Sequence, residues 1–122
     1  MKKLIMSMTV LMMVIGTGAF AKDFSNKQRA REAEIRILQN QAVSEGVKLI
    51  TPEEAKEAAF AAAGINGAQV KRVKVKLDRE DDYRPALYIY EVEFKHDGLE
   101  YEFDIDAVNK RILDSDVDSW YD

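Results

Sequence analysis

Hydrophobic and polar residues alternate one by one along much of the second half of the chain, which predicts β-strands. Residues 86–95 (ALYIYEVEFK) and 99–106 (LEYEFDID) place apolar residues at every second position, mostly with acidic residues between them. Alternate side chains share one face of a strand, so both segments are expected to be apolar on one face and acidic on the other. Residues 69–77 (QVKRVKVKL) alternate valine with basic residues, and 111–117 (RILDSDV) are expected to form a short fourth strand.

A two-residue turn at Asp97-Gly98 joins the two central strands in a predictable register. This dipeptide is typical of the type I′ turn of a β-hairpin. The expected pairs are Phe94–Tyr101, Val92–Phe103 and Tyr90–Ile105 on the apolar face, and Lys95–Glu100, Glu93–Glu102 and Glu91–Asp104 on the other face. Because turn chemistry and face pattern require the same pairing, they predict a hairpin with one acidic face. The charged residues 78–85 (DREDDYRP) are expected to form the turn before this hairpin.

A helix is expected over residues 51–64 (TPEEAKEAAFAAAG). Thr51 is the expected N-cap, Glu54 completes a capping box with it, and Gly64 follows the last helical residue. The small residues of this helix allow it to lie close to the sheet. The predicted fold is therefore α+β, with one or two helices packed on a three- to four-stranded antiparallel β-meander.

A second helix is expected earlier, over residues 24–45, with Ser25 and Gln28 as its capping box. Its better apolar stripe consists of Ile35, Leu38 and Ala42. That stripe is narrow, so this helix either attaches loosely to the domain or packs on a partner.

Residues 1–21 have the pattern of a secretory signal peptide. Lys2 and Lys3 precede a short apolar run, and Ala19 and Ala21 occupy the small-residue positions of an A-x-A cleavage site. Cleavage is therefore expected after Ala21, which implies a periplasmic or secreted protein without a membrane span after cleavage. The alternative is an uncleaved N-terminal anchor, although a membrane span needs about 20 apolar residues.

Composition excludes several classes of function. Cleavage of residues 1–21 would leave 101 of the 122 residues. These contain 16 Lys and Arg against 22 Asp and Glu, which gives a net charge near −6. A protein with this charge is not expected to bind nucleic acid or anionic lipid, because binding to either requires clustered basic residues on the protein. The absence of cysteine excludes disulfides, thiolate zinc sites and a cysteine nucleophile.

Three segments, residues 50–64, 73–80 and 87–113, resemble the PepSY domain family. Its strands follow the pattern Y-x-V-x-F…G…Y-x-F-x-I-D-A, which this chain matches after a helix that opens with paired glutamates. The resemblance implies a small non-catalytic α+β unit, similar to the fold of β-lactamase-inhibitor proteins and found in peptidase propeptides and exported bacterial proteins. One departure is at residues 109–111, NKR where the family has Thr-Gly-Lys. Asn109 tolerates left-handed backbone, so the turn is expected to persist.

No set of catalytic residues is recognisable in the sequence. His96 is the only histidine and falls in the predicted hairpin, where a triad would lack a buried serine and carboxylate beside it. The family brings no catalytic residues to carry over. We therefore expect no enzymatic activity and no cofactor.

The acidic face of the predicted sheet is the candidate binding surface. Its carboxylates are Glu91, Glu93, Glu100, Glu102, Asp104 and Asp106. Lys74 and Lys76 would flank it in a simple meander, so it is a solvated face with partly balanced charge, a docking surface for a basic partner, or a weak Ca²⁺ site. A flat sheet face supplies the six to eight oxygens of a Ca²⁺ site poorly.

Leu87 and Ile89 have the parity of this acidic face, and an exposed apolar pair needs a cover. The first helix, through Ile35 and Leu38, or the aromatic tail is expected to provide it; otherwise this end of the sheet contacts a partner. The residues expected to bind a partner are Leu87, Ile89, Glu91, Glu93, Glu102, Asp104, Trp120 and Tyr121.

The sequence thus predicts a signal peptide (1–21), an N-terminal helix or lead-in (22–47) and a PepSY-like domain (48–122). The expected function is an exported, non-catalytic module that binds another exported or envelope protein, such as a peptidase that it regulates or inhibits. The alternative is a protein that binds a cation or small ligand through its acidic sheet face.

Overall fold

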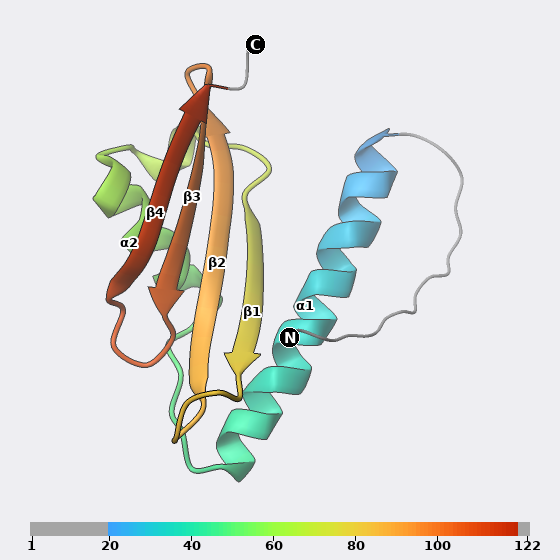
Figure 1. Cartoon of the computed structure of the whole chain (residues 1–122). Helices are drawn as coiled ribbons and strands as arrows, with labels where there is room; N and C mark the ends of the chain where they lie inside the picture. The colour runs from blue at the N-terminus through green and yellow to red at the C-terminus, as the bar shows by residue number, and fades with distance from the viewer. Residues whose placement is uncertain (1–19, 120–122) are drawn as a thin grey trace.

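Four strands form one antiparallel sheet in the computed structural model, which describes residues 20–119 (Figure 1). The strands are β1 (Lys74–Glu80), β2 (Leu87–His96), β3 (Leu99–Asp106) and β4 (Ile112–Ser119). They lie in the order β1-β2-β3-β4, so each strand pairs with its neighbour in sequence and the sheet is a meander. With two helices packed against it, the sheet confirms the predicted α+β class, and β1 and β4 are its two edges.

The central hairpin has the predicted register. Phe94 pairs with Tyr101 on the apolar face and Glu93 with Glu102 on the other, and the remaining predicted pairs are also present. Asp97 and Gly98 have φ values of 57° and 79°, the left-handed backbone that a type I′ turn needs at both positions.

The first strand starts and ends later than predicted. The segment expected to begin it starts at Gln69, the last residue of a short 3₁₀ helix, η2 (Gly67–Gln69), and includes Arg72 at a φ of 59°. Residues 78–80, expected to lie in the charged turn, instead pair with residues 87–89 of β2. Their pairing with β2 holds these charged residues in a strand. The polar composition of the segment alone does not reveal this, because strand formation depends on the neighbouring strand.

The turn between β3 and β4 is present as predicted, but a different residue adopts the left-handed backbone. Lys110, rather than Asn109, has the left-handed backbone, with a φ of 69°. Asp106 Oδ1 accepts hydrogen bonds from the backbone N–H groups of Val108 (2.8 Å) and Asn109 (3.3 Å), and Asn109 Oδ1 accepts one from Arg111 N (3.0 Å). Side chains from both ends of the turn therefore hold Lys110 in the position where the family has glycine.

Helix α2 (Pro52–Ala63) has both predicted caps. Thr51 Oγ1 accepts from Glu54 N (3.1 Å), Glu54 Oε1 accepts from Thr51 N (2.9 Å), and Gly64 ends the helix at a φ of 70°. Its alanines at positions 55 and 59 are fully buried, which lets the helix lie close against β2 and β3.

Helix α1 (Phe20–Ser44) begins before the predicted cap at Ser25, so that expectation is wrong; the helix simply continues through Ser25. The predicted stripe does face the protein, because Ile35 is 5% exposed, Ala42 is 1% exposed and Leu38 packs against the core. The helix runs beside β1, and Gly46 follows it at a φ of 77°. The C-terminal part of α1 is therefore part of the domain core and is not loosely attached.

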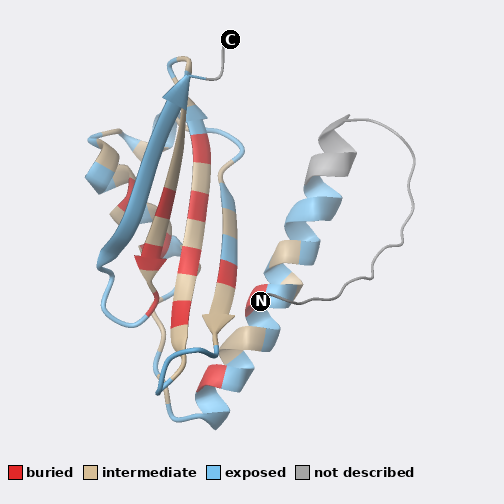
Figure 2. Cartoon of the chain, in the orientation of Figure 1, coloured by how far each residue is buried: buried red, intermediate tan, exposed pale blue. Residues whose placement is uncertain are grey.

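The core lies on one face of the sheet only. Tyr88, Tyr90, Val92 and Phe94 alternate along β2 as its most deeply buried side chains (Figure 2). In the view of Figure 1, α2 lies behind the sheet and α1 beside its β1 edge, and no described element lies in front. The opposite face of the sheet, which carries the predicted carboxylates, is not covered by any element of residues 20–119.

Candidate functional site: the acidic face of the sheet

Rows of charged residues cross the uncovered face of the sheet. One row runs Lys74–Glu93–Glu102–Asp116 from β1 to β4, the next runs Lys76–Glu91–Asp104–Asp114, and a shorter one runs Lys95–Glu100–Asp118 from β2 to β4. We call the eight carboxylates of these rows the acidic face. The predicted residues Glu91, Glu93, Glu102 and Asp104 are thus brought together as expected.

The charge of this face is polarised across the strands. Lys74 Nζ lies 3.7 Å from Glu93 Oε1, and Lys76 is paired with Glu91 in the strand register. The basic side chains of β1 therefore offset the glutamates of β2. On β3 and β4, all the residues of these three rows are acidic. The negative charge of the face is therefore concentrated toward the β4 edge.

Crowding changes the acidity of the central carboxyls. Burial raises the pKa of Glu91, and the charge of Asp104 raises it further. The pKa of Glu102 and of Asp104 is likewise raised, first by loss of hydration and then by neighbouring carboxylates. One oxygen from each of these three groups lies within 4.8 Å of the other two. A cation or a basic side chain placed here would relieve this repulsion.

The aspartates of β4 were missing from the predicted site. Asp114, Asp116 and Asp118 all lie on the acidic face because they pair with Asp104, Glu102 and Glu100. The alternation in DSDVDS carries this signal, since every second residue is an aspartate. It was overlooked because the segment has little apolar character to mark a strand, and β4 owes its extended form to pairing with β3.

Leu87 and Ile89 lie at one end of the same face. Ile89 is flanked by Asp78 on β1 and Asp106 on β3, and both apolar side chains are half-buried. Ile35 and Leu38 do not cover them, because both pack into the core on the opposite face of the sheet. The other expected cover, Trp120 and Tyr121, lies outside the described residues.

His96 occupies the last position of β2 beside the hairpin turn, where it pairs with Leu99. Its place agrees with the hairpin position predicted for it. It lies at the end of the sheet and not among the eight carboxylates of the acidic face.

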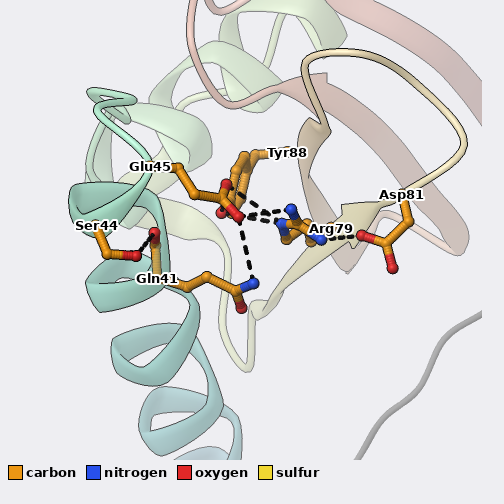
Figure 3. Close-up of polar contacts among 6 residues, drawn as sticks. All are labelled: Gln41, Ser44, Glu45, Arg79, Asp81 and Tyr88. Carbon is orange, nitrogen blue, oxygen red and sulfur yellow. Dashed lines mark hydrogen bonds and ion pairs between the residues drawn. The ribbon is translucent and has the colours of Figure 1, made fainter.

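A polar cluster that sequence reasoning missed joins α1 to the sheet (Figure 3). Glu45 Oε1 accepts from the Tyr88 hydroxyl at 2.7 Å, and Glu45 Oε2 lies 2.5 Å from Arg79 Nη2. Arg79 also binds Asp81, and its Nε donates to the Tyr88 hydroxyl at 3.2 Å. Burial and the bond to Glu45 raise the pKa of Tyr88 to about 12, while the Tyr88 and Arg79 bonds lower the pKa of Glu45.

This cluster has a structural role, because its hydrogen bonds and ion pairs join Glu45, at the end of α1, to Arg79 of β1 and Tyr88 of β2. Glu45 and Tyr88 are 43 positions apart in the chain, so no local pattern connects them. Tyr88 lies on the face of residues 86–95 that was expected to be apolar, and it is 1% exposed, but its hydroxyl reaches the end of α1.

A groove of about 280 Å³ is lined by residues of α1, α2 and the start of β1. Ile35, Val73 and Val75 provide apolar lining, whereas Arg31, Arg36, Lys56, Glu32 and Glu53 are its charged lining residues. Because these charges are of both signs, the groove favours no one class of ligand as clearly as the acidic face does.

Comparison with known families matches residues 49–116 to the model described as "Peptidase propeptide and YPEB domain" (PepSY). The match begins just before α2 and ends within β4, which leaves α1 outside it. No curated protein and no solved structure matches the chain. Within residues 20–119, neither helix is long and apolar enough to cross a membrane.

Proposed function

The chain belongs to the PepSY family, and we propose that it is an exported, non-catalytic module that binds another exported or envelope protein through its acidic face. Domains of this family are typically propeptide-like or inhibitory modules. That background supports a regulatory role toward a peptidase as the first partner class to test. Residues 1–21 would direct the chain to export and would then be removed by cleavage after Ala21.

The observation that carries this proposal is the uncovered and polarised acidic face. Eight carboxylates cross β2, β3 and β4, while the lysines of β1 lie opposite only the glutamates of β2. Like charges directly opposite each other destabilise a sheet, so such a face is retained at a cost to stability. A partner surface rich in Lys and Arg would offset that cost on binding.

Leu87 and Ile89 would supply an apolar contact at one end of the same interface. We propose that they lie against the partner together with the predicted tail residues Trp120 and Tyr121. Apolar and aromatic anchors of this kind carry most of the binding energy at protein interfaces, whereas surrounding charges set orientation and association rate.

Helix α1 is better tested by point substitution than by deletion. Ile35 and Ala42 belong to the core, so a chain without residues 22–47 would expose apolar surface and capture proteins non-specifically. We propose that α1 is an N-terminal accessory to the 48–122 domain, held by these contacts and by Glu45.

The deciding experiment is a pull-down from envelope extract with residues 22–122 as bait, read by mass spectrometry. Three baits are compared: the native sequence, Glu93→Lys with Glu102→Lys, and a control with Glu57→Lys and Asp82→Lys. The control makes the same charge change at exposed positions on α2 and in the β1–β2 loop. We expect a protein retained by the native and control baits and lost by the acidic-face variant. Retention by all three baits, or by none, would overturn the proposal.

A cation site is the second candidate, because Glu91, Glu102 and Asp104 bring carboxylate oxygens within 4.8 Å of one another. Calorimetric titration with millimolar CaCl₂ tests it, with Glu102→Gln as the matched variant. Heat of binding that disappears in the variant would support a cation site at these residues. No heat from the native chain would remove this candidate.

A further inference from the structure

No other strand of the part of the chain that the structure describes pairs with the outer edge of β4. All eight residues of Ile112–Ser119 are exposed, and β4 is drawn in the exposed colour along its whole length in Figure 2. Among the described strands, β4 pairs with β3 alone. The backbone groups on its other side can therefore accept a further strand.

Hydrogen bonds identify which residues of β4 point to the free edge. Ser115 N donates to Asp114 Oδ1 at 3.0 Å and Ser119 N donates to Asp118 Oδ1 at 2.9 Å. Neither N–H is thus directed into the β3 ladder. Because the N–H and C=O of one residue point to the same side of an antiparallel strand and alternate along it, residues 115, 117 and 119 face outward. Val117 lies between Ser115 and Ser119, whose N–H groups are already bonded to aspartate side chains. The Val117 N–H is therefore the edge donor on which the test below acts.

The side chains of β4 indicate what kind of strand fits this edge. Asp114, Asp116 and Asp118 line one side of β4, and Val117, which is 51% exposed, lies on the other. A complementary strand would place basic side chains beside the aspartates and apolar side chains beside Val117.

The same kind of pairing already occurs within this sheet. On β1, Lys74 and Lys76 alternate with Val75 and lie beside Glu93 and Glu91 of β2. A strand of alternating Lys and apolar residues therefore pairs with a carboxylate-lined strand in this sheet.

We propose that the free edge of β4 binds an extended segment of the partner protein, in which Lys or Arg alternates with apolar residues, as a fifth strand of the sheet. The proposal rests on the proposed function for the existence of a protein partner, but it stands on a different surface feature, the strand edge. A second copy of this chain is the less favoured occupant, because antiparallel β4–β4 pairing would bring two rows of aspartates together.

The first test uses a defined peptide. A fluorescently labelled, end-blocked Val-Lys-Val-Lys-Val-Lys-Val peptide is titrated with the purified full chain and followed by anisotropy. The matching peptide with Glu in place of Lys serves as the charge control. We expect saturable binding of the Lys peptide only, and absence of that binding would overturn the proposal.

Val117→Pro tests whether the binding uses the strand edge. Proline removes the outward N–H and blocks the edge, while residues 114, 116 and 118 keep their bonds to β3. We expect binding of the Lys peptide to weaken about tenfold or more, because proline removes the Val117 N–H donor and its ring keeps an added strand away from the neighbouring carbonyl groups. Val117→Thr keeps the N–H and should bind like the native chain. If Val117→Pro does not fold by circular dichroism, Ser115→Pro is the second edge variant. The N–H of Ser115 is already bonded to Asp114, so this variant acts by placing the proline ring against an added strand.

Equal binding by the native chain and a folded edge variant would overturn the strand-edge proposal. Concentration-dependent self-association of the native chain that Val117→Pro abolishes would also overturn it, in favour of a second copy. The pull-down separates this inference from the proposed function. A partner lost with Glu93→Lys and Glu102→Lys but retained by Val117→Pro would leave the acidic face as the binding surface and remove the edge.

Discussion

At the scale of single residues, the β3–β4 turn shows how side chains replace the usual glycine. Lys110 has a φ of 69°, a backbone conformation that costs an L residue with a Cβ about 1 kcal/mol or more. Asp106 and Asn109 hold the neighbouring N–H groups and so compensate for part of this cost. The Lys110 ammonium lies 3.9 Å from Glu54, and this exposed ion pair offers little in return.

We therefore expect Lys110→Gly to raise the free energy of unfolding by about 1 kcal/mol, because glycine adopts this backbone without a Cβ penalty. Urea denaturation followed by circular dichroism measures the change. Asn109→Gly is the control: it removes the hydrogen bond to Arg111 N without relieving a positive φ, so it should not stabilise. A Lys110→Gly variant no more stable than the native chain would contradict this account.

At the scale of elements, α1 is held by packing and by one polar cluster. Its narrow apolar stripe suggested loose attachment, but Ile35 and Ala42 are buried and Glu45 binds both Arg79 and Tyr88. The cluster connects the C-terminal end of α1 to β1 and β2 at once. Charge-assisted bonds between partly buried groups are stronger than surface ion pairs, so this cluster should be measurable.

Arg79→Leu is expected to lower the free energy of unfolding by about 1–2 kcal/mol, since it leaves Glu45 and Tyr88 without their shared partner. Glu45→Gln should do the same by a smaller amount, and the double variant should cost less than the two single changes together because they share one network. Chemical denaturation of the three variants gives the coupling. Lys56→Leu, which removes only the exposed ion pair to Glu53, is the control and should change stability by less than about 0.5 kcal/mol. Additive costs at positions 45 and 79 would show that the cluster is not a unit.

At the scale of the whole molecule, two groups of carboxyls respond to pH in opposite directions. The pKa of Glu45 is lowered by its bonds to Tyr88 and Arg79, so its contribution to stability is lost as pH falls below the ordinary value of 4.5. The pKa of Glu91, Glu102 and Asp104 is raised by burial and by mutual repulsion. A carboxyl with a raised folded-state pKa stabilises the fold below its unfolded pKa, and that stabilisation is lost as pH rises through the folded value.

Glu102→Gln is therefore expected to be more stable than the native chain at pH 7, by about 0.5 kcal/mol for one relieved cross-strand repulsion. That corresponds to a rise in Tm of roughly 2–4 °C for a domain of this size. The difference should shrink as pH falls toward 4, where the native carboxyl takes up a proton. Thermal melts between pH 4 and 7 measure it, with Glu57→Gln on the exposed side of α2 as the control. A Tm gain that persists unchanged at pH 4 would assign the effect to something other than charge.

Local patterns of the sequence by themselves determined α2, the central hairpin and its acidic face. Thr51, Glu54 and Gly64 act within a few residues of one another, and Asp97-Gly98 fixes a register that the period-2 pattern also requires. These features depend on short-range chemistry, which is why the capping box, the turn and the paired carboxylates could all be located from the printed sequence.

Tertiary structure alone decided the remaining features, because their causes lie far apart in the chain. The ladder with β2 turned the charged residues 78–80 into strand, and pairing with β3 put the three aspartates of β4 on the acidic face. Packing of Ile35 and Ala42, together with the Glu45 cluster, attached α1 to the core. The order of the strands placed the lysines of β1 at one edge and the aspartates of β4 at the other, and only this arrangement creates the charge polarity and the open edge on which the binding proposals rest.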